Sequence, residues 1–325
     1  MSTTRLKERS KAVGWGGSGS FVAPSVIVEV EPGFVVAARL DRSGRRVGRI
    51  AAREVEAGSI DAQLNRANLA NPSELQRAVQ AALGAIGNGG GRLGLLVPDP
   101  IVRAAILSFE SLPDARKEVE GLVRWRMKDL LPFPPEEARL AYQVLGRWPD
   151  CVEVLAMAVK SSVLAEYEAA VENVNSGPGL ILPATAALLP LVPEAEPSSQ
   201  LLVHVCSGWM TTVLVERSQL RTWRTRDMAR VTPEDLPGEV AREAARVIAS
   251  TRDRLNLEVG RVWLCSRPPG TSDLVPALTS AVSCAVEPLA GSEDFASSLS
   301  TAEETLFKHF GATVAGLVRN SAKEA

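Results

Sequence analysis

The sequence predicts an α/β protein made of two similar lobes, with a small α/β insert in the first lobe. Three observations carry this prediction. A pattern of three strands followed by a helix begins near residue 25 and returns near residue 201. A strand, a helix and two further strands occupy residues 98–160, inside the first occurrence. A charged, proline-rich segment without periodicity, residues 193–199, separates the two occurrences and is expected to be a linker.

The first lobe is expected to span residues 24–192. Its strand-forming residues are interrupted by short turns that contain Gly33 and Gly44. Pro72 opens a helix with one apolar face, and Ser161 caps another helix after the insert. The expected elements are strands at 25–30, 34–40, 47–55, 93–97 and 180–182, and helices at 161–174, at 183–191 and from Pro72.

The insert contains the most distinctive stretch of the chain, a helix stopped by prolines. Pro113 suits the first helical turn, and Pro132 begins a run that forbids continuation. Arg126 falls within the apolar stripe of this helix, next to Trp125. Either Arg126 reaches water or pairs within the protein, or the two side chains face a partner. Strands are expected at 102–109, 140–145 and 152–159.

The second lobe is expected to span residues 200–319 and to repeat the first pattern. Strands are expected at 201–206, 211–216, 220–225, 261–265 and 285–289, and helices at 237–255, 273–283 and 302–318. Residues 320–325 form a tail. Residues 1–23 are basic and then Gly/Ser-rich, so we expect a disordered leader.

Composition disfavours several classes of protein. A net charge of −2 over 325 residues provides no electrostatic footprint for nucleic acid. Prolines break the longest apolar runs below the roughly 20 residues that a membrane span needs. The four cysteines form no CxxC pair, and the two histidines offer few candidates for a catalytic triad or a metal site. We therefore expect a cytoplasmic protein with no catalytic residues and no metal site.

Three segments resemble the PilM family of type IV pilus assembly proteins, which belongs to the actin-like ATPase superfamily. They are RWRMKDLLPFPP at 124–135, LAYQV at 140–144 and FGATVAGLVR at 310–319. The similarity in order and spacing runs from about Pro24 to Arg319. The resemblance implies an actin-like ATPase fold with two duplicated lobes of three strands plus helices. The family commonly has an acidic residue at the position of Arg126.

The chain departs from the family where nucleotide should bind. Actin-like ATPases hold phosphates and Mg²⁺ with two DxG hairpins. At the first hairpin this chain has Glu29 and Glu31, and Val36 replaces the family's Lys. At the second hairpin it has His204 and Cys206 at the Asp and Gly positions. Like charges about 4 Å apart cost roughly 4 kcal/mol at an effective dielectric of 20, so Glu31 opposes a phosphate.

We therefore expect a degenerate nucleotide site, no bound cofactor and no ATP hydrolysis, with ATP and Mg²⁺ binding as the alternative. In the loop at 265–270, the family's Gly-Gly pair is also missing. The residues left to line such a site are Glu29, Gly33, Ser207, Gly208, Thr211, Ser266 and Gly270.

The resemblance implies a scaffold at the inner face of the cytoplasmic membrane. It would bind the cytoplasmic tail of a PilN-like membrane protein, contact other pilus platform and motor proteins, and meet the membrane only through partners. The resemblance also allows a homo-oligomer. The family's groove lies between the first lobe and its insert, and the matching motifs point to Arg124, Trp125, Lys128, Leu131, Pro132 and Phe133. The alternatives are a nucleotide-binding switch of the same fold and a GspL-like component of type II secretion.

Overall fold

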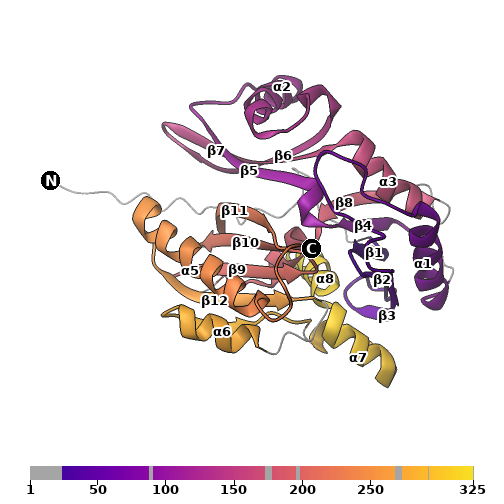
Figure 1. The fold of residues 1–325 in the computed structure, drawn as a ribbon. Helices are drawn as coiled ribbons and strands as arrows, with labels where there is room; N and C mark the ends of the chain where they lie inside the picture. The colour runs from indigo at the N-terminus through magenta and orange to yellow at the C-terminus, as the bar shows by residue number, and fades with distance from the viewer. Residues whose placement is uncertain are drawn as a thin grey trace.

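Two five-stranded sheets and a three-stranded sheet form the framework of the computed structural model (Figure 1). The structure describes residues 24–87, 91–172, 178–194, 198–267, 273–291 and 293–324. The expected leader at 1–23 lies outside these ranges, as do residues 195–197 of the expected linker. No helix in the described ranges combines the length and hydrophobicity needed to cross a bilayer.

The two larger sheets share one topology, which confirms the predicted duplication. The first has the order β3-β2-β1-β4-β8, and the second has the order β11-β10-β9-β12-β13. In each, the first three strands are antiparallel and the next two run parallel to the first. The first-sheet strands are β1 (Val26–Glu31), β2 (Phe34–Leu40), β3 (Val47–Glu54), β4 (Leu93–Val97) and β8 (Pro178–Pro183). The second-sheet strands are β9 (Ser199–Cys206), β10 (Trp209–Glu216), β11 (Gln219–Asp227), β12 (Val259–Ser266) and β13 (Ala285–Pro288).

The insert is a three-stranded sheet with one helix packed on it. Its strands β5 (Val102–Phe109), β6 (Ala138–Trp148) and β7 (Cys151–Lys160) have the order β5-β7-β6. Helix α2 (Arg116–Met127) buries Val119, Val123 and Met127 against this sheet. In Figure 1 the insert lies above both lobes, with α2 on its outer side.

Helices cover the sheets and also join the lobes. Helices α1 (Pro72–Ala85) and α3 (Ser161–Val171) pack on the first sheet, and α5 (Leu236–Leu255) and α6 (Leu274–Ala281) lie on the second. Helix α4 (Ala184–Leu188) follows β8 and packs against α8 (Ala312–Glu324). Helix α7 (Thr301–Phe310) lies along β3 (Figure 1). The last two helices therefore tie the end of the chain to the first lobe.

Two predicted helices are wrong in extent. The helix expected at 302–318 is two helices, α7 and α8, separated at Gly311. The helix expected at 183–191 is the short α4 followed by a 3₁₀ turn at Leu189–Leu191. Pro190 lacks the N–H that another α-helical turn requires, which accounts for the second change.

The contact between α4 and α8 depends on a glycine. A Cβ built at Gly316 would lie 1.8 Å from the carbonyl oxygen of Ala187, which belongs to the backbone and has little freedom to move. We expect Gly316→Ala to lower the free energy of unfolding by about 1–3 kcal/mol, measured by urea titration. The matched control is Gly121→Ala on α2, where a Cβ meets nothing within 4 Å. Because Ala is a better helix former than Gly, Gly121→Ala should raise the free energy of unfolding by about 0.5–1 kcal/mol. Equal effects of the two substitutions would contradict this account.

Candidate functional site

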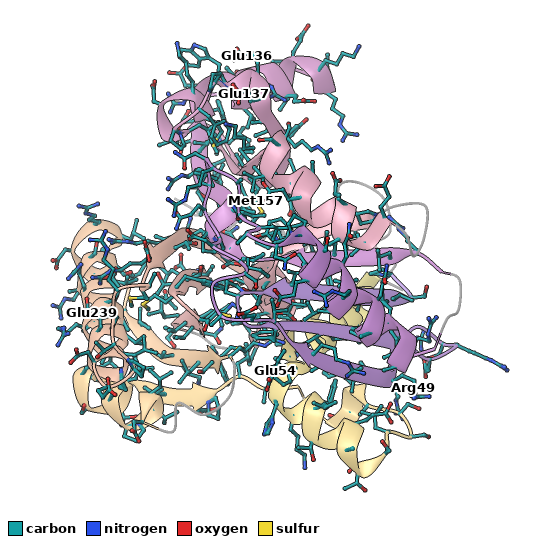
Figure 2. All side chains as sticks on the ribbon, turned by 45° about the vertical axis from the view of Figure 1, so that its right-hand side comes forward. Arg49, Glu54, Glu136, Glu137, Met157 and Glu239 are labelled. Carbon is teal, nitrogen blue, oxygen red and sulfur yellow. The ribbon has the colours of Figure 1, made fainter. Side chains whose placement is uncertain are left out.

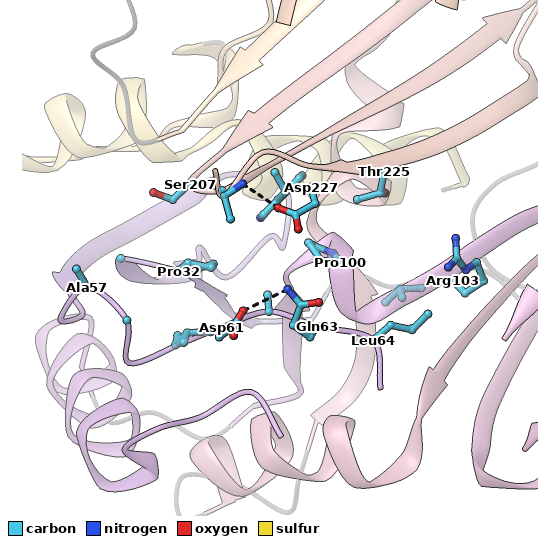
Figure 3. Close-up of a pocket in the computed structure, with 18 residues that line it drawn as sticks. Pro32, Ala57, Asp61, Gln63, Leu64, Pro100, Arg103, Ser207, Thr225 and Asp227 are labelled. Atoms are coloured by element: carbon cyan, nitrogen blue, oxygen red, sulfur yellow. Dashed lines mark hydrogen bonds between the residues drawn. The ribbon is translucent and has the colours of Figure 1, made fainter. Parts of the chain in front are cut away.

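Two hairpin turns face each other across a cleft of about 460 Å³ between the lobes. Gly33 forms the turn between β1 and β2 with φ 97°, and Gly208 forms the turn between β9 and β10 with φ 80°. Both values favour glycine, because a side chain is strained there. Ser207 lies beside Gly208 at the cleft wall (Figure 3). Three of the predicted site residues, Gly33, Ser207 and Gly208, therefore line one cavity.

The rim of this cleft carries charges of both signs. Asp61 accepts a hydrogen bond from Gln63 at 3.2 Å, and Asp227 accepts one from the Ala229 N–H at 2.8 Å (Figure 3). Arg103 of β5 lines the same cleft from the insert side. The lobes and the insert thus all contribute to the wall, and its outer part is a polar surface without one dominant charge.

Behind the turns, the lobe junction is filled by a buried ion pair. Arg267 follows β12 in the second lobe, is 2% exposed, and pairs with Glu29 of β1 in the first lobe. The hydroxyl of Thr313 donates to the other oxygen of Glu29 at 2.6 Å. Arg267 also donates to the Thr313 hydroxyl at 3.1 Å and to the carbonyl of Phe310 at 2.7 Å. Both carboxylate oxygens of Glu29 are therefore occupied by groups of this chain.

Aromatic rings enclose the same guanidinium. Its central carbon lies 5.4 Å from the ring centroid of Phe34 and 5.8 Å from that of Phe310. A cation over an aromatic face gains attraction, most strongly where water is excluded. Burial alone would lower the pKa of Arg267, but the Glu29 carboxylate raises it, so the side chain keeps its charge. The junction thus holds a permanent cation.

Glu31 lies in the same junction but has a different environment. It is fully buried, and the Cys206 thiol donates to it at 3.5 Å. Its other oxygen has no hydrogen-bond partner among the described residues. Burial raises the pKa of Glu31 well above its ordinary value, and nearby Glu29 and Asp99 raise it further. Glu31 is thus held in its neutral form, in place of the glycine that follows the Asp in a DxG hairpin.

A third buried carboxyl connects the first lobe to His204. Asp99 follows β4 and accepts the backbone N–H of Thr185 at 3.0 Å. The Thr185 hydroxyl lies 2.8 Å from Nδ1 of His204, whose ring meets Trp209 edge to face at 4.9 Å. Burial lowers the pKa of His204 well below its ordinary value, so the ring is neutral. Burial also raises the pKa of Asp99 to about 6, although the hydrogen bond from Thr185 lowers it.

These residues do not fit a hydrated Mg²⁺ with nucleotide phosphates. Such a site needs exposed carboxylate oxygens and open backbone N–H groups. Glu29 is fully engaged by Arg267 and Thr313, while Glu31 and His204 are buried and neutral. Among the described residues, no set of three His, Cys, Asp or Glu side chains is arranged to hold a metal ion.

Thr211 and Ser266, two further predicted site residues, do not line the cleft. Thr211 is buried in β10, where its hydroxyl lies 2.8 Å from that of Thr225. Ser266 is the last residue of β12, and Gly270 lies outside the described residues. Sequence reasoning missed Arg267. Its signal in the sequence is a single charge directly after a buried strand, in the loop at 265–270 where the family has its Gly-Gly pair.

A second cavity, of about 170 Å³, lies between the first lobe and the insert. Aliphatic side chains dominate its wall, and Arg139 is its one charged lining residue among those described. Arg139 pairs with Glu168 at 2.5 Å, so its charge is matched within the protein. The lining residues come from β4, β8 and α3 on one side and from β5, β6 and β7 on the other: Val97, Val102, Arg139, Leu140, Ala141, Met157, Ala158, Val159, Leu164, Ile181, Leu182 and Pro183. We call this cavity the apolar groove.

The six predicted partner residues lie elsewhere on the insert and differ in exposure. Trp125 is 65% exposed, and Lys128 and Pro132 are also exposed. In contrast, Phe133 is buried in the insert core, and Leu131 packs partly against it. None of these residues lines the apolar groove.

Two arginines of the insert helix stabilise the insert itself. Arg124 donates to the carbonyls of Pro135 and Ala138 at 2.6 and 2.9 Å and thereby holds the proline corner to α2. Arg126 is exposed, with its guanidinium 5.8 Å from the ring centroid of Phe109. This geometry agrees with the interpretation in which Arg126 interacts within the protein.

Comparisons with known proteins identify the fold. No family model matches the sequence, and a search of curated proteins finds no match. The solved structure of a PilM-PilN type IV pilus biogenesis complex superimposes with a TM-score of 0.78 at 16% identity, covering 93% of this chain and 99% of that chain. A protein from Bacteroides thetaiotaomicron with an actin-like ATPase fold and unknown function gives 0.54 at 8% identity, covering 82% and 90%. The chain therefore has the predicted actin-like ATPase fold, in its PilM-like form.

A third similar structure relates to the secretion alternative. The cytoplasmic domain of EpsL, an inner-membrane component of the type II secretion system of Vibrio cholerae, gives a TM-score of 0.49 at 13% identity, covering 92% of this chain and 94% of that chain. This likeness is too low to support an argument about function.

The buried Asp99 predicts a specific pH dependence of stability. Its folded pKa of about 6 exceeds the ordinary value of 3.8. Its contribution to stability is therefore fully present below about pH 4 and is lost as the pH rises through 6, a change of about 3 kcal/mol. Asn cannot titrate, so Asp99→Asn should show a smaller fall in urea titrations between pH 4 and pH 7, and buried Glu31, whose pKa is also raised, accounts for the remainder. The exposed Asp150→Asn should keep the full fall, and an equally large fall in Asp99→Asn would contradict the assignment.

Proposed function

We propose that this protein is a non-catalytic scaffold of a type IV pilus or related secretion assembly platform, which binds the cytoplasmic tail of a PilN-like membrane protein. The apolar groove between the first lobe and the insert is the observation that carries the proposal. The PilM-like fold supports it, since the PilM structure at TM-score 0.78 is one of a complex with PilN. We place the protein at the inner face of the cytoplasmic membrane, where such a tail would hold it.

The strand order around the groove supports an extended ligand. Strand β8 is the outer strand of the first sheet, and β6 is an outer strand of the insert sheet. Each contributes residues to the groove, Ile181 and Leu182 from β8 and Leu140 from β6. An extended peptide can pair its backbone with a sheet edge and insert alternate side chains into pockets beside it. A tail with aliphatic anchors fits this wall, because the charge of Arg139 is already matched.

The lobe junction supports the non-catalytic part of the proposal. A kinase or ATPase of this fold needs charged groups aimed at phosphate and metal. Here Arg267 and Glu29 neutralise each other, and Glu31 and His204 are buried without charge. We propose that other pilus platform and motor proteins contact the scaffold through further surfaces, among which the exposed side of α2 around Trp125 is a candidate.

The second candidate function is a nucleotide-binding switch of the same fold. The cleft of about 460 Å³ beside Gly33 and Gly208 favours it, because hairpin backbone N–H groups can approach an anion there. The charges at the cleft rim weaken the case for a nucleotide-binding switch. Two acidic side chains, Asp61 and Asp227, line that space together with Arg103, the single cation among the described lining residues.

The groove assignment is tested with a synthetic peptide that carries the cytoplasmic tail of a PilN-like membrane protein. Ala141 is an exposed groove residue of β6, so Ala141→Glu adds charge and bulk to the groove without emptying a core. We expect calorimetry to show binding that is at least 10-fold weaker, about 1.4 kcal/mol. The charge control is Ser108→Glu, at an exposed insert position outside the groove, and it should bind as the unaltered protein does.

Trp125→Ala distinguishes the groove from the outer side of α2. We expect it to change the affinity less than 2-fold, because Trp125 lies outside the groove. If Trp125→Ala loses binding while Ala141→Glu binds as the unaltered protein does, the tail site would lie on α2 instead. A peptide that binds neither the unaltered protein nor any variant would defeat the proposed function.

A further inference from the structure

Arg267 joins three separate parts of the chain at one buried point. The residue itself belongs to the second lobe, Glu29 belongs to the first sheet, and Thr313 and Phe310 belong to the C-terminal helices. The sequence separations are 238 residues to Glu29 and 46 to Thr313. No other ion pair between the described residues has both side chains 1% exposed. The junction is thus the one place where the two lobes share a fully buried charge pair within the described part of the chain.

The pair is also enclosed by this chain, and only Nε of Arg267 is buried without a hydrogen-bond partner among the described residues. Nη1 of Arg267 donates to Glu29 and Thr313, and Nη2 donates to the Phe310 carbonyl. The second oxygen of Glu29 accepts from Thr313. The rings of Phe34 and Phe310 lie within 6 Å of the guanidinium. A phosphate could reach this cation only if these contacts were broken.

We infer that Arg267, Glu29, Thr313 and the Phe310 carbonyl form an interlobe latch that holds the two lobes closed without a bound ligand. In two-lobed proteins, closure commonly depends on a ligand that contacts both lobes. Here a side chain of the second lobe makes the contacts to the first lobe that such a ligand would make. The lobe arrangement is therefore a constant property of the folded chain. This inference is independent of tail binding in the apolar groove.

Two native cysteines report on this junction. Cys206 ends β9 next to Glu31, and Cys265 lies two residues before Arg267; both are buried. Cys151 and Cys284 are half-buried and lie in the insert and the second lobe. Separation of the lobes would expose the Cys206 side of the junction, while the surroundings of Cys151 in the insert hairpin would stay unchanged. Alkylation rates at individual cysteines therefore measure closure of the latch.

The second lobe contains a matched control. Arg226 donates to Glu243 and Glu239 at 2.5 and 2.6 Å, and Glu243 is 1% exposed. This network stays within one lobe, and Figure 2 shows Glu239 on the outer side of that lobe. Arg226→Met thus removes an arginine from a buried carboxylate without touching the junction.

The experiment measures iodoacetamide alkylation of each cysteine in the full-length protein by peptide mass spectrometry at pH 8. Arg267→Met should raise the Cys206 rate at least 10-fold relative to Cys151. Arg226→Met should change that ratio less than 2-fold. An unchanged Cys206 rate in Arg267→Met would overturn the latch, and so would an equal increase in both variants.

A double variant separates the latch from the general cost of an unpaired buried charge. Glu29→Met with Arg267→Met removes both charges, and replacing a buried pair by apolar residues is often tolerated. If the latch holds the lobes, Cys206 should still react at least 10-fold faster in the double variant, while hydrogen exchange of α5 stays unchanged. If Cys206 in the double variant is alkylated as slowly as in the unaltered protein, the latch is overturned. This variant decides the question if Arg267→Met alone fails to fold.

Discussion

The ion pair between Arg267 and Glu29 is the interaction on which the arrangement of this protein depends. Removing one member of a buried pair typically costs about 3–5 kcal/mol, because the other charge is left without a partner. That penalty couples β1, the end of β12 and the C-terminal helices, since each supplies part of the charge or its hydrogen bonds. The neutral Glu31 beside the pair follows from the same burial, which raises the pKa of a carboxyl that has no cation of its own.

Apart from this junction, the described residues contain an apolar cavity between the first lobe and the insert. The apolar groove lies where two sheet edges approach each other, and its aliphatic wall faces a gap that the chain itself does not fill. A partner tail would complete both edges there. Under the two proposals, charged groups at the junction would organise the lobes, and apolar groups beside the insert would bind the partner tail.

Pattern in the sequence was sufficient for the duplicated topology, because strand alternation and turn glycines are local signals. Local signals did not reveal the break at Gly311, since Ala312 and Val314 continue the helical pattern beyond it. The role of Arg267 depends on Glu29, 238 residues away, which no local pattern contains. Only the tertiary structure shows that Phe133 is buried and that the cavity lies beside β6.

The most direct test of the central claim is the melting temperature of the full-length protein with and without millimolar Mg²⁺–ATP. A ligand that binds only the folded state at 100 times its dissociation constant adds about 2.7 kcal/mol. Because the latch already occupies the junction, we predict no change in melting temperature. A concentration-dependent rise of about 4 °C or more would show that the folded protein binds nucleotide and would contradict a degenerate nucleotide site.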